Sequence, residues 1–590
     1  MAAQRAYTTH PLVLRRVTVR SVHQVTPRMR RVVLGGEELA AFTRDGTGHP
    51  AFAAPGFDDH IKLILAADGD VHAALPAQLP HGIEWTPAEH RLTRDYTPRR
   101  VDPEAGELHL DFVVHGDGPA EAWSAAAREG DELWFVGPKS SLRLPERLDW
   151  IQLVGDETAL PAIGRFLDER PLDAPAHVLV TVSDDSARQE LALREGDTVT
   201  WVVAEPGDAE ALEAAVRALP VEAGEGYVWA AAESRALLPV RRYLQRERKL
   251  PKDRLSVTGY WHREEAPAPE AEATADAAVR EPARISSPLP WLVARAALQL
   301  GVVDAVADAP GLSAEALATR LGVSGPGIGV LLPLLSSYGV VVGADDGAPG
   351  LRLGPAGEEL LDEHEREEYT GHEAELLLAL THLAPALRGG GSPWRLASGG
   401  TLHEAVAQDA ERYGELVEEC EQLVFLLGGL TADPLWESIG TCLLTGPGSA
   451  SVAAALDDAR RRPRLRVAED AVPVAVLRGH VPAPDRIDWT AGPADVAVAA
   501  KALAHRTDEE AVLLLARLAG WTRTAVLVEA SRPDGLSPHA AETALHAYAA
   551  TGSPLRDSAA IAALAHRSGW EVERTIALGW GTEATVLRRA

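Results

Sequence analysis

The sequence predicts a multidomain fold, in which an antiparallel β domain, an α/β domain, a helical domain and a second α/β domain follow one another. Its 590 residues are several times the length of a typical domain. Residues 11–148 begin with short strand-like segments, whereas residues 149–263 alternate apolar and amphipathic segments. Residues 264–284 are rich in Ala, Pro and Glu, have too few large apolar side chains to form a core, and are interpreted as a linker.

The composition limits the classes of function. A formal net charge of -29 and a pI of about 5.1 oppose binding to nucleic acids and to anionic membrane surfaces. Neither a signal-peptide pattern nor an apolar stretch long enough to span a bilayer occurs, so we expect a cytoplasmic protein without membrane insertion. Two cysteines, Cys420 and Cys442, are too few for an iron–sulfur cluster, and we expect no metal site. Any redox chemistry would therefore need an organic cofactor.

The two domains before the linker differ in pattern. Residues 11–148 contain LVLRRVTVR, MRRVVL, HIKLIL and ELHLDFVVH, which predict an antiparallel β-barrel or a sandwich. Residues 149–263 contain the apolar segments WIQLVG, AHVLVTVS, TVTWVVA and GYVWAAA, separated by helical patterns such as LPAIGRFLDER. This alternation is typical of a parallel sheet with crossover helices, and predicts an α/β nucleotide-binding domain.

The two domains after the linker repeat this contrast. Residues 285–436 are expected to be nearly all helical, with Ser313 as a helix N-cap. Two helical segments followed by SYGVVVGADDGAPGLRLGPAG resemble a winged helix, a fold that can bind DNA. Its helix LLPLLSSYGV has no Arg or Lys for phosphates, which argues against that role. Residues 437–590 include CLLTGPG, DVAVAAKALAHR and AVLVEA, and predict a second, Rossmann-like α/β domain.

The most specific stretch is RDYTPR at residues 94–99. Along a strand, Arg94 and Tyr96 would share one face and Thr97 and Arg99 the other. An aromatic ring can cover a flavin ring, a hydroxyl can hydrogen-bond its N5 atom, and arginine binds a diphosphate. Taken alone, these residues more often indicate a solvent-exposed strand with surface ion pairs than a ligand site.

The pattern R-x-Y-[ST]-x-R resembles the flavin-binding motif of the siderophore-interacting proteins, a branch of the ferredoxin-reductase-like flavoproteins. HGDGPAEAW at residues 115–123 resembles the H-G-x-G-P-A-x-x-W segment of that family. Its glycines permit close backbone approach, and a helix starting near Pro119 directs N–H groups at a diphosphate. An ordinary Gly-Pro helix start is the alternative. The resemblance implies FAD as the cofactor, bound by Arg94, Tyr96, Thr97, Arg99, His115, Gly116, Gly118, Ala120 and Trp123.

A second part of the resemblance concerns the nicotinamide cofactor, NADPH or NADH. GDETALPAI at residues 155–163 resembles the motif of the family on that side, and it occupies a strand-to-helix turn where such ligands bind. WAAAE at residues 229–233 resembles W-x-A-G-E, but Ala232 replaces the common glycine and would crowd the nicotinamide. The family's closing G-Y-W implies aromatic packing on the far face of the flavin. The residues implied are Asp156, Thr158, Ala159, Ser183, Asp184 and Trp261.

The resemblance also implies the substrate, a ferric siderophore. Such complexes are often anionic, so their site should be basic, and Lys62, Lys139 and Arg263 match the basic substrate-binding residues of the family. A purely surface role is the alternative for each. The implied activity is an FAD-dependent ferric-siderophore reductase, which moves electrons from NAD(P)H to iron(III) and releases iron(II). Iron(II) binds hard oxygen donors less tightly.

Residues 285–590 resemble the plant- and streptomycete-type O-methyltransferases, which have a winged-helix-like dimerisation domain before their catalytic domain. His505 lies where that family has its general base, and Glu529 where an acidic helper follows. The expected D-x-G-G-G-x-G loop is replaced by TGPGSAS, in which Pro447 restricts the turn, so binding of S-adenosylmethionine is doubtful. Glu469 remains a candidate ribose-binding acid.

We therefore expect residues 285–590 to be a degenerate module for docking or dimerisation, giving a homodimer through its helical domain. The alternative is a bifunctional protein whose C-terminal half is an active S-adenosylmethionine-dependent O-methyltransferase. A third hypothesis, a non-enzymatic interaction protein, requires that neither cofactor binds.

Overall fold

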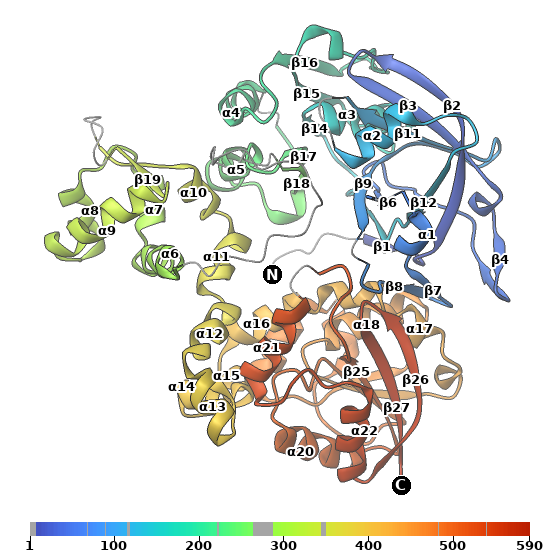
Figure 1. Cartoon of the computed structure of the whole chain (residues 1–590), viewed down its shortest axis with the longest axis vertical. Helices are drawn as coiled ribbons and strands as arrows, with labels where there is room; N and C mark the ends of the chain where they lie inside the picture. Colours follow the sequence, from blue (N-terminus) through green and yellow to red (C-terminus); the bar gives the residue numbers. More distant parts are fainter. Residues whose placement is uncertain are drawn as a thin grey trace.

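The computed structural model describes residues 7–262 and 287–590, apart from residues 68, 89, 115–117, 221–222, 344–349, 482 and 538–539. The predicted linker, Arg263, His115 and Gly116 lie outside the described residues. Figure 1 shows the strand-rich first region beside the first parallel sheet, with the helical region to one side and a second α/β region below.

The first region is built on a seven-stranded antiparallel sheet. Its buried side chains include Val17, Val32, Leu63, Phe112 and Phe135, which pack on one another inside the sheet. The strands in spatial order are β10 (Pro98–Asp102), β11 (Glu107–Val113), β3 (Met29–Gly35), β2 (Leu14–Thr26), β12 (Glu132–Val136), β6 (Ile61–Ala66) and β9 (Arg91–Tyr96).

The two edge strands of this sheet, β9 and β10, are consecutive in the chain and are separated only by Thr97. The sheet must therefore curl until its opposite edges meet at Thr97. We call this junction the seam, comprising β9, Thr97 and β10. Smaller elements surround the sheet: β1 (Tyr7–Thr9), η1 (Glu37–Leu39), β4 (Phe42–Arg44), β5 (Thr47–His49), α1 (Val71–Ala74), β7 (Ala77–Leu79), β8 (Gly82–Glu84), α2 (Pro119–Ala126) and β13 (Ser140–Leu142).

The second region is a five-stranded parallel sheet with helices on both faces. The order is β16 (Thr198–Val203), β15 (Ala176–Val182), β14 (Trp150–Gly155), β17 (Gly226–Glu233) and β18 (Leu255–Trp261). Its helices are α3 (Leu160–Glu169), α4 (Ala209–Ala218) and α5 (Leu237–Arg242). The chain leaves β14 toward one edge and returns to its other side at β17, so a crevice is expected at the carboxyl ends of these two strands.

The helical region begins with a group that has its own core. These elements are α6 (Leu289–Leu300), α7 (Val302–Asp308), α8 (Ala314–Leu321), α9 (Gly325–Ser337), β19 (Val341–Val342) and β20 (Arg352–Leu353). Ser313 caps α8 by accepting a hydrogen bond from the Ala316 N–H, which confirms the predicted cap. None of the individual helices described is long and apolar enough to cross a membrane. Two bent pairs of helices, α6 with α7 and α8 with α9, would be long and apolar enough by length and composition alone.

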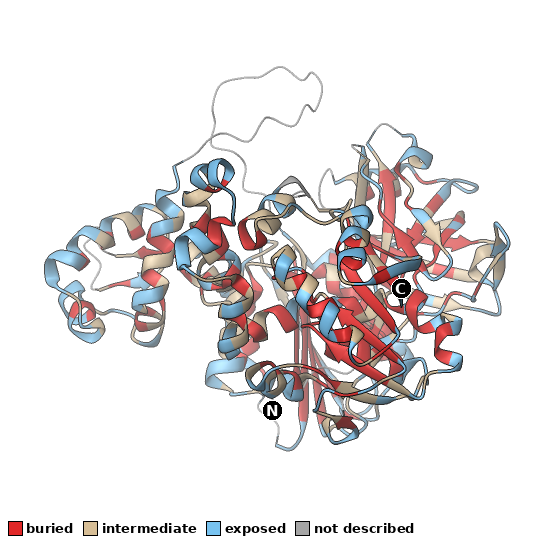
Figure 2. Ribbon diagram, turned by 90° about the horizontal axis from the view of Figure 1, so that it is seen from below, coloured by how far each residue is buried: buried red, intermediate tan, exposed pale blue. Residues whose placement is uncertain are grey.

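The remaining helices connect this group to the last sheet, and the later ones share a core with that sheet. They are α10 (Pro355–Glu359), α11 (Glu363–Thr370), α12 (His372–Ala379), α13 (Leu383–Gly389), α14 (Pro393–Ser398), α15 (Leu402–Gln408), α16 (Ala410–Glu419), η7 (Glu421–Phe425) and α17 (Gly428–Ala432). One core joins Trp394, Tyr413 and Leu423 from these helices to Cys442 and Val498 from the sheet. Figure 2 shows buried residues concentrated in the strands.

The last sheet has seven strands, and all their pairings are parallel except the two made by β27 (Thr582–Arg589), which runs antiparallel to both of its neighbours. Their order is β23 (Ile487–Asp488), β22 (Arg464–Val467), β21 (Thr441–Thr445), β24 (Val496–Ala500), β25 (Thr524–Ala530), β27 (Thr582–Arg589) and β26 (Trp570–Gly579). The helices around it are α18 (Ser449–Asp458), α19 (Ala471–His480), α20 (Asp508–Ala519), α21 (Ala540–Thr551) and α22 (Ser558–Arg567).

The two halves of the chain pack against each other where β8 meets β26 (Figure 1). The buried Glu84 carboxylate pairs with Arg532 at 2.6 Å and accepts a hydrogen bond from the Gly581 N–H at 3.2 Å. The Trp85 and Trp580 rings lie 6.2 Å apart, centroid to centroid. The C-terminal half is thus held directly on the β7–β8 hairpin of the first region as well as by chain connectivity.

Candidate functional site

Aromatic side chains line one side of the seam. The Tyr96 ring packs on Phe112 with centroids 4.4 Å apart, and Phe112 packs on Trp123 of α2 at 5.7 Å. Burial raises the pKa of the Tyr96 phenol, which stays protonated at neutral pH. The structure therefore brings together Tyr96 and Trp123, two residues from separate predicted motifs, around one aromatic stack.

Thr97 connects the seam to the parallel sheet. It is buried, and its side chain hydrogen-bonds the Tyr260 hydroxyl on β18. Tyr260 in turn lies 6.1 Å from the Trp229 ring, centroid to centroid. The predicted hydroxyl is thus at the junction of the two regions, where a cofactor shared by both would have to bind.

The two arginines of the RDYTPR stretch have different surroundings. Arg94 is exposed, and its guanidinium donates to the Thr93 carbonyl oxygen at 2.8 Å. Arg99 is mostly buried and pairs with Asp168 of α3 at 2.7 Å. Arg94 is therefore the better placed of the two to meet an incoming phosphate, whereas Arg99 joins β10 to α3.

Helix α2 presents its N-terminus to solvent. Gly118 is the N-cap and provides no side-chain hydrogen bond, and among the described residues no atom outside its chain neighbours lies within 4 Å of where a Cβ on Gly118 would be. The first N–H groups of a helix without a cap can bind an anion. Ala120, on the first turn, is buried against the sheet. These features fit the diphosphate of FAD.

The crevice of the parallel sheet is held by Asp156. Its Oδ1 atom accepts from Thr158 N at 2.9 Å and from Thr158 Oγ1 at 2.5 Å, while Oδ2 accepts from Trp261 Nε1 at 2.7 Å. Burial raises the pKa of Asp156, and these hydrogen bonds oppose that rise. Asp156 thus fixes the turn and the Trp261 ring. Beneath them, Ala159 packs so closely on Gly155 that a Cβ there would lie 2.3 Å from the alanine Cβ.

The far side of the crevice contains a residue that the sequence did not single out, Arg28. Its Nη2 atom donates to Ser183 Oγ at 2.5 Å, and its guanidinium lies 3.7 Å from Asp184. Ser183 Oγ also donates to Glu157 Oε1 at 2.5 Å. Hydrogen bonds from Ser186 are the main reason that the pKa of Asp184 is lowered. The turn between β2 and β3 thus adds a cation to the predicted ribose-binding residues.

Ala232, which we expected to crowd the nicotinamide, lies in the hydrophobic core. It is buried on β17, opposite Gly259 of β18, in the core on the side of α4 and α5. Its methyl group is therefore accommodated by packing.

A basic cluster lies next to the seam. Lys62 on β6 is opposite Asp95 in the strand register and pairs with it at 2.8 Å. Lys139, which follows β12, donates to Gln422 Oε1 at 2.9 Å, and its Nζ lies 5.1 Å from the centroid of the Phe425 ring. Burial lowers the pKa of Lys139, while the charge of Asp95 opposes this shift and that of Lys62 adds to it. Both predicted lysines belong to one cluster.

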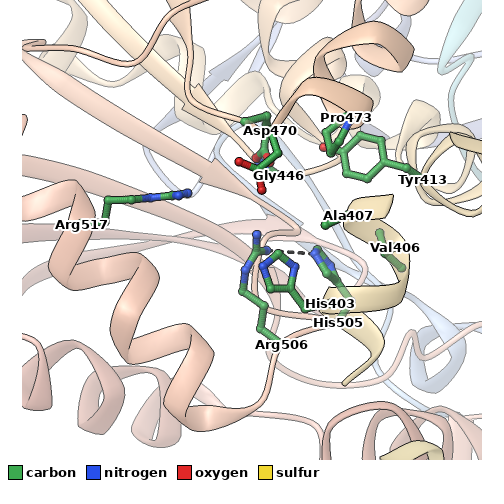
Figure 3. A pocket seen from close by; sticks show the side chains of 11 residues that line it. His403, Val406, Ala407, Tyr413, Gly446, Asp470, Pro473, His505, Arg506 and Arg517 are labelled. Atoms are coloured by element: carbon green, nitrogen blue, oxygen red, sulfur yellow. Dashed lines mark hydrogen bonds between the residues drawn. The ribbon is translucent and has the colours of Figure 1, made fainter. Parts of the chain in front are cut away.

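A separate small cavity lies in the C-terminal half (Figure 3). Its volume of about 20 Å³ is room for roughly one water molecule. His505 is fully buried there, and Arg506 Nη1 donates to its Nε2 atom at 2.9 Å. The lining residues include His403, Tyr413, Gly446, Glu469, His505 and Arg506.

The chemistry of this cavity differs from that of an active general base. Burial lowers the pKa of His505 well below its ordinary value and that of His403 to about 4, so both imidazoles are neutral near pH 7. Because Arg506 occupies the acceptor nitrogen of His505, that nitrogen is not available to take a proton. Glu469 Oε1 accepts from Thr445 Oγ1 and Gly446 N, both at 2.6 Å, and so closes the altered loop. Glu529 accepts from Leu503 N, and burial raises its pKa to about 6.

Among the described residues, no group of three or more His, Cys, Asp or Glu side chains is arranged to hold a metal ion.

Three family models match the chain. A siderophore-interacting FAD-binding domain matches residues 18–142, and a siderophore-interacting protein model matches residues 148–264. An O-methyltransferase dimerisation domain matches residues 292–363. The first two cover the seam, the crevice and both lysines of the basic cluster.

Individual proteins match each half. An NADPH-dependent ferric-chelate reductase of Escherichia coli (strain K12) is 31% identical over 254 residues, 42% of this chain and 94% of that protein. A ferric vibriobactin reductase of Vibrio cholerae is 30% identical over 243 residues, 40% of this chain and 86% of that protein. A solved siderophore utilization protein from T. fusca is 36% identical over 45% of this chain and 98% of its own, with a TM-score of 0.41. An O-methyltransferase from neocarzinostatin biosynthesis is 20% identical over 53% of this chain and 100% of its own, with a TM-score of 0.40.

Proposed function

The chain belongs to the siderophore-interacting protein family through its first half, and from this we propose that it is an FAD-dependent ferric-siderophore reductase using NADPH or NADH. One observation carries the proposal. Lys62 lies opposite Asp95 and Ile61 opposite Tyr96 in the register of β6 and β9, so the basic cluster adjoins the seam. An anionic iron complex on these lysines would be close to a cofactor bound there.

The described residues fit FAD. The Tyr96 and Trp123 rings, the Thr97 hydroxyl, the exposed Arg94 guanidinium and the uncapped start of α2 would hold it. When bound, FAD supplies an acceptor for two electrons from a nicotinamide and a donor of single electrons to iron(III). Arg28 and the Asp156 network would orient the nicotinamide nucleotide at the crevice.

The protein's own part is binding and orientation. The cationic lysines offset the negative charge of a ferric siderophore and position it. Reduction to iron(II) weakens its bonds to hard oxygen donors, and the metal leaves without any proton transfer from a side chain.

The proposal is tested with the purified full chain. It should be yellow or take up added FAD, and anaerobic NADPH or NADH should bleach the flavin bands. Ferric chelates should then restore them, with iron(II) detected by a ferrous trap. A colourless protein that binds no FAD, or a reduced protein that no ferric chelate reoxidises, would contradict it.

For the C-terminal half we favour docking over methyl transfer, because Arg506 occupies the acceptor nitrogen of His505 and Glu469 closes the altered loop. Calorimetry with millimolar S-adenosylmethionine should detect no binding, and measurable binding would favour the bifunctional alternative. A homodimer through residues 285–436 and a cytoplasmic location remain part of the proposal. Size determination in solution tests the dimer.

A further inference from the structure

We propose that the C-terminal half supplies part of the iron-complex site, with Gln422 and Phe425 of η7 selecting among complexes by charge and size. This inference rests on the proposed function. It assigns a role to the C-terminal half, which lies outside the roughly 250 residues that the chain shares with the two ferric reductases.

Lys139 lies against two side chains of η7. Its ammonium group contacts an amide oxygen, Gln422 Oε1 at 2.9 Å, and the face of the Phe425 ring at 5.1 Å. Both partners come from η7, and 283 residues of chain separate Lys139 from Gln422. An anion bound at the Lys139 ammonium group would therefore lie next to η7.

The two η7 side chains that contact Lys139 are neutral. Lys62 is already paired with the Asp95 carboxylate, so its charge is largely offset within the protein. An amide oxygen and an aromatic face carry no formal charge, and the Asp95 carboxylate, which is paired with Lys62, offsets the charge of Lys139 only in part. An anionic iron complex can replace the Gln422 amide as the partner of Lys139, and this exchange leaves no carboxylate without its ion pair. Lys139 is therefore better suited than Lys62 to attract an anionic iron complex.

Packing and a hydrogen bond hold η7 in place. Leu423 is buried in the core of the C-terminal half and packs against Gly448 at the start of α18. Ser451 of α18 donates to the Cys420 carbonyl oxygen at 2.7 Å, directly before η7. The contact of β8 with β26 holds this half on the β7–β8 hairpin of the first region. η7 therefore forms a wall of defined shape beside Lys139.

The test introduces a carboxylate at this wall in the full-length flavoprotein. Gln422→Glu would pair with Lys139 and compete with anionic ligands, while Gln408→Glu, the same change at an exposed position on α15, is the matched control. Binding is measured without reductant, by quenching of tryptophan fluorescence. The probes are an anionic ferric tris-catecholate and a neutral ferric tris-hydroxamate.

Gln422→Glu should raise the Kd of the anionic complex about tenfold and that of the neutral complex less than about threefold. Gln408→Glu should change neither. Phe425→Ala removes the aromatic ring beside Lys139 and so makes room for a larger ligand. It should lower the Kd of bulky ferric complexes more than the Kd of the small complex ferric EDTA. Flavin content and the anaerobic rate of flavin reduction by NADPH should match wild type in all variants, which shows that they fold.

The inference and the proposed function fail differently. If wild-type protein reduces no ferric complex, the proposed function fails. If wild type reduces ferric complexes but Gln422→Glu and Phe425→Ala bind both probes as wild type does, η7 is not part of the site. Equal weakening for the anionic and the neutral probe would also overturn selection by charge.

Discussion

At the scale of single residues, buried Asp59 stands beside the candidate site. Its Oδ2 atom accepts from Gly56 N and from Ser141 Oγ, both at 2.8 Å, whereas Oδ1 has no partner among the described residues. Burial raises the pKa of Asp59 to about 7. The folded protein therefore keeps a proton that the unfolded chain loses near pH 4.

This raised pKa makes stability depend on pH. Between about pH 4 and pH 7 the folded state binds more protons than the unfolded state, so the free energy of unfolding falls as the pH rises, by roughly 2–4 kcal/mol in all. Asp59→Asn removes the effect, and its Tm should exceed that of wild type at pH 8 but match it at pH 4. Thermal denaturation measures this, with exposed Asp173→Asn as the control. Equal Tm differences at both pH values would contradict the assignment.

Arg28 gives a second prediction at this scale. Arg28→Ala removes the cation beside Ser183 and Asp184, and should raise the Kd for NADPH roughly tenfold. Arg16→Ala is the control, since Arg16 is on the same hairpin but pairs with Glu132. Anaerobic stopped-flow separates the Kd from the limiting rate of flavin reduction, which should stay within about twofold. A change in the limiting rate alone would argue against a binding role.

These residues show what a sequence can and cannot predict. Tyr96 and Trp123 lie in short motifs whose spacing is local, and the structure places them in one aromatic stack. The partner of Arg99, Asp168, is on a helix of another region, and no local pattern indicates it. Gln422 is more distant still from Lys139 in the chain, so only the folded structure relates them.

At the scale of elements, α2 is joined to the seam through aromatic contact. Trp123→Ala would break the stack with Phe112 and Tyr96, and should weaken FAD binding about tenfold, while Trp123→Phe keeps a ring and should weaken it less. Titration of apoprotein with FAD, followed by flavin fluorescence, gives both Kd values. Equal affinities for wild type and Trp123→Ala would show that the stack only supports the fold.

The element order was largely predictable, because period-two segments and alternating apolar segments are local signals. For the antiparallel domain the sequence left a barrel and a sandwich open, because the choice between them depends on the pairing of strands far apart in the chain. Likewise, α12 to α17 were expected as part of a helical domain, yet their core is shared with β21 and β24.

At the scale of the whole molecule, the two halves meet at β8 and β26. Glu84→Ala leaves Arg532 without its buried partner and should lower the free energy of unfolding by about 1–3 kcal/mol. Arg532→Ala alone leaves the buried Glu84 carboxylate without its ion pair. A double-mutant cycle of Glu84→Ala and Arg532→Ala, measured by thermal denaturation, should give a coupling free energy between the two side chains above about 0.5 kcal/mol. Additive effects would mean that this pair contributes nothing to docking.

The seam has a consequence for the motion of the protein. The two edge strands, β9 and β10, adjoin without pairing with each other. Exchange of their amide hydrogens with solvent therefore depends on occasional local opening. A ligand that contacts Tyr96 on one edge and the region beside β10 on the other would bind the closed arrangement of the two edges. Its binding would stabilise that arrangement and make local opening rarer. Hydrogen exchange in β9 and β10 should then slow together as FAD is added, while exchange in β26 stays the same.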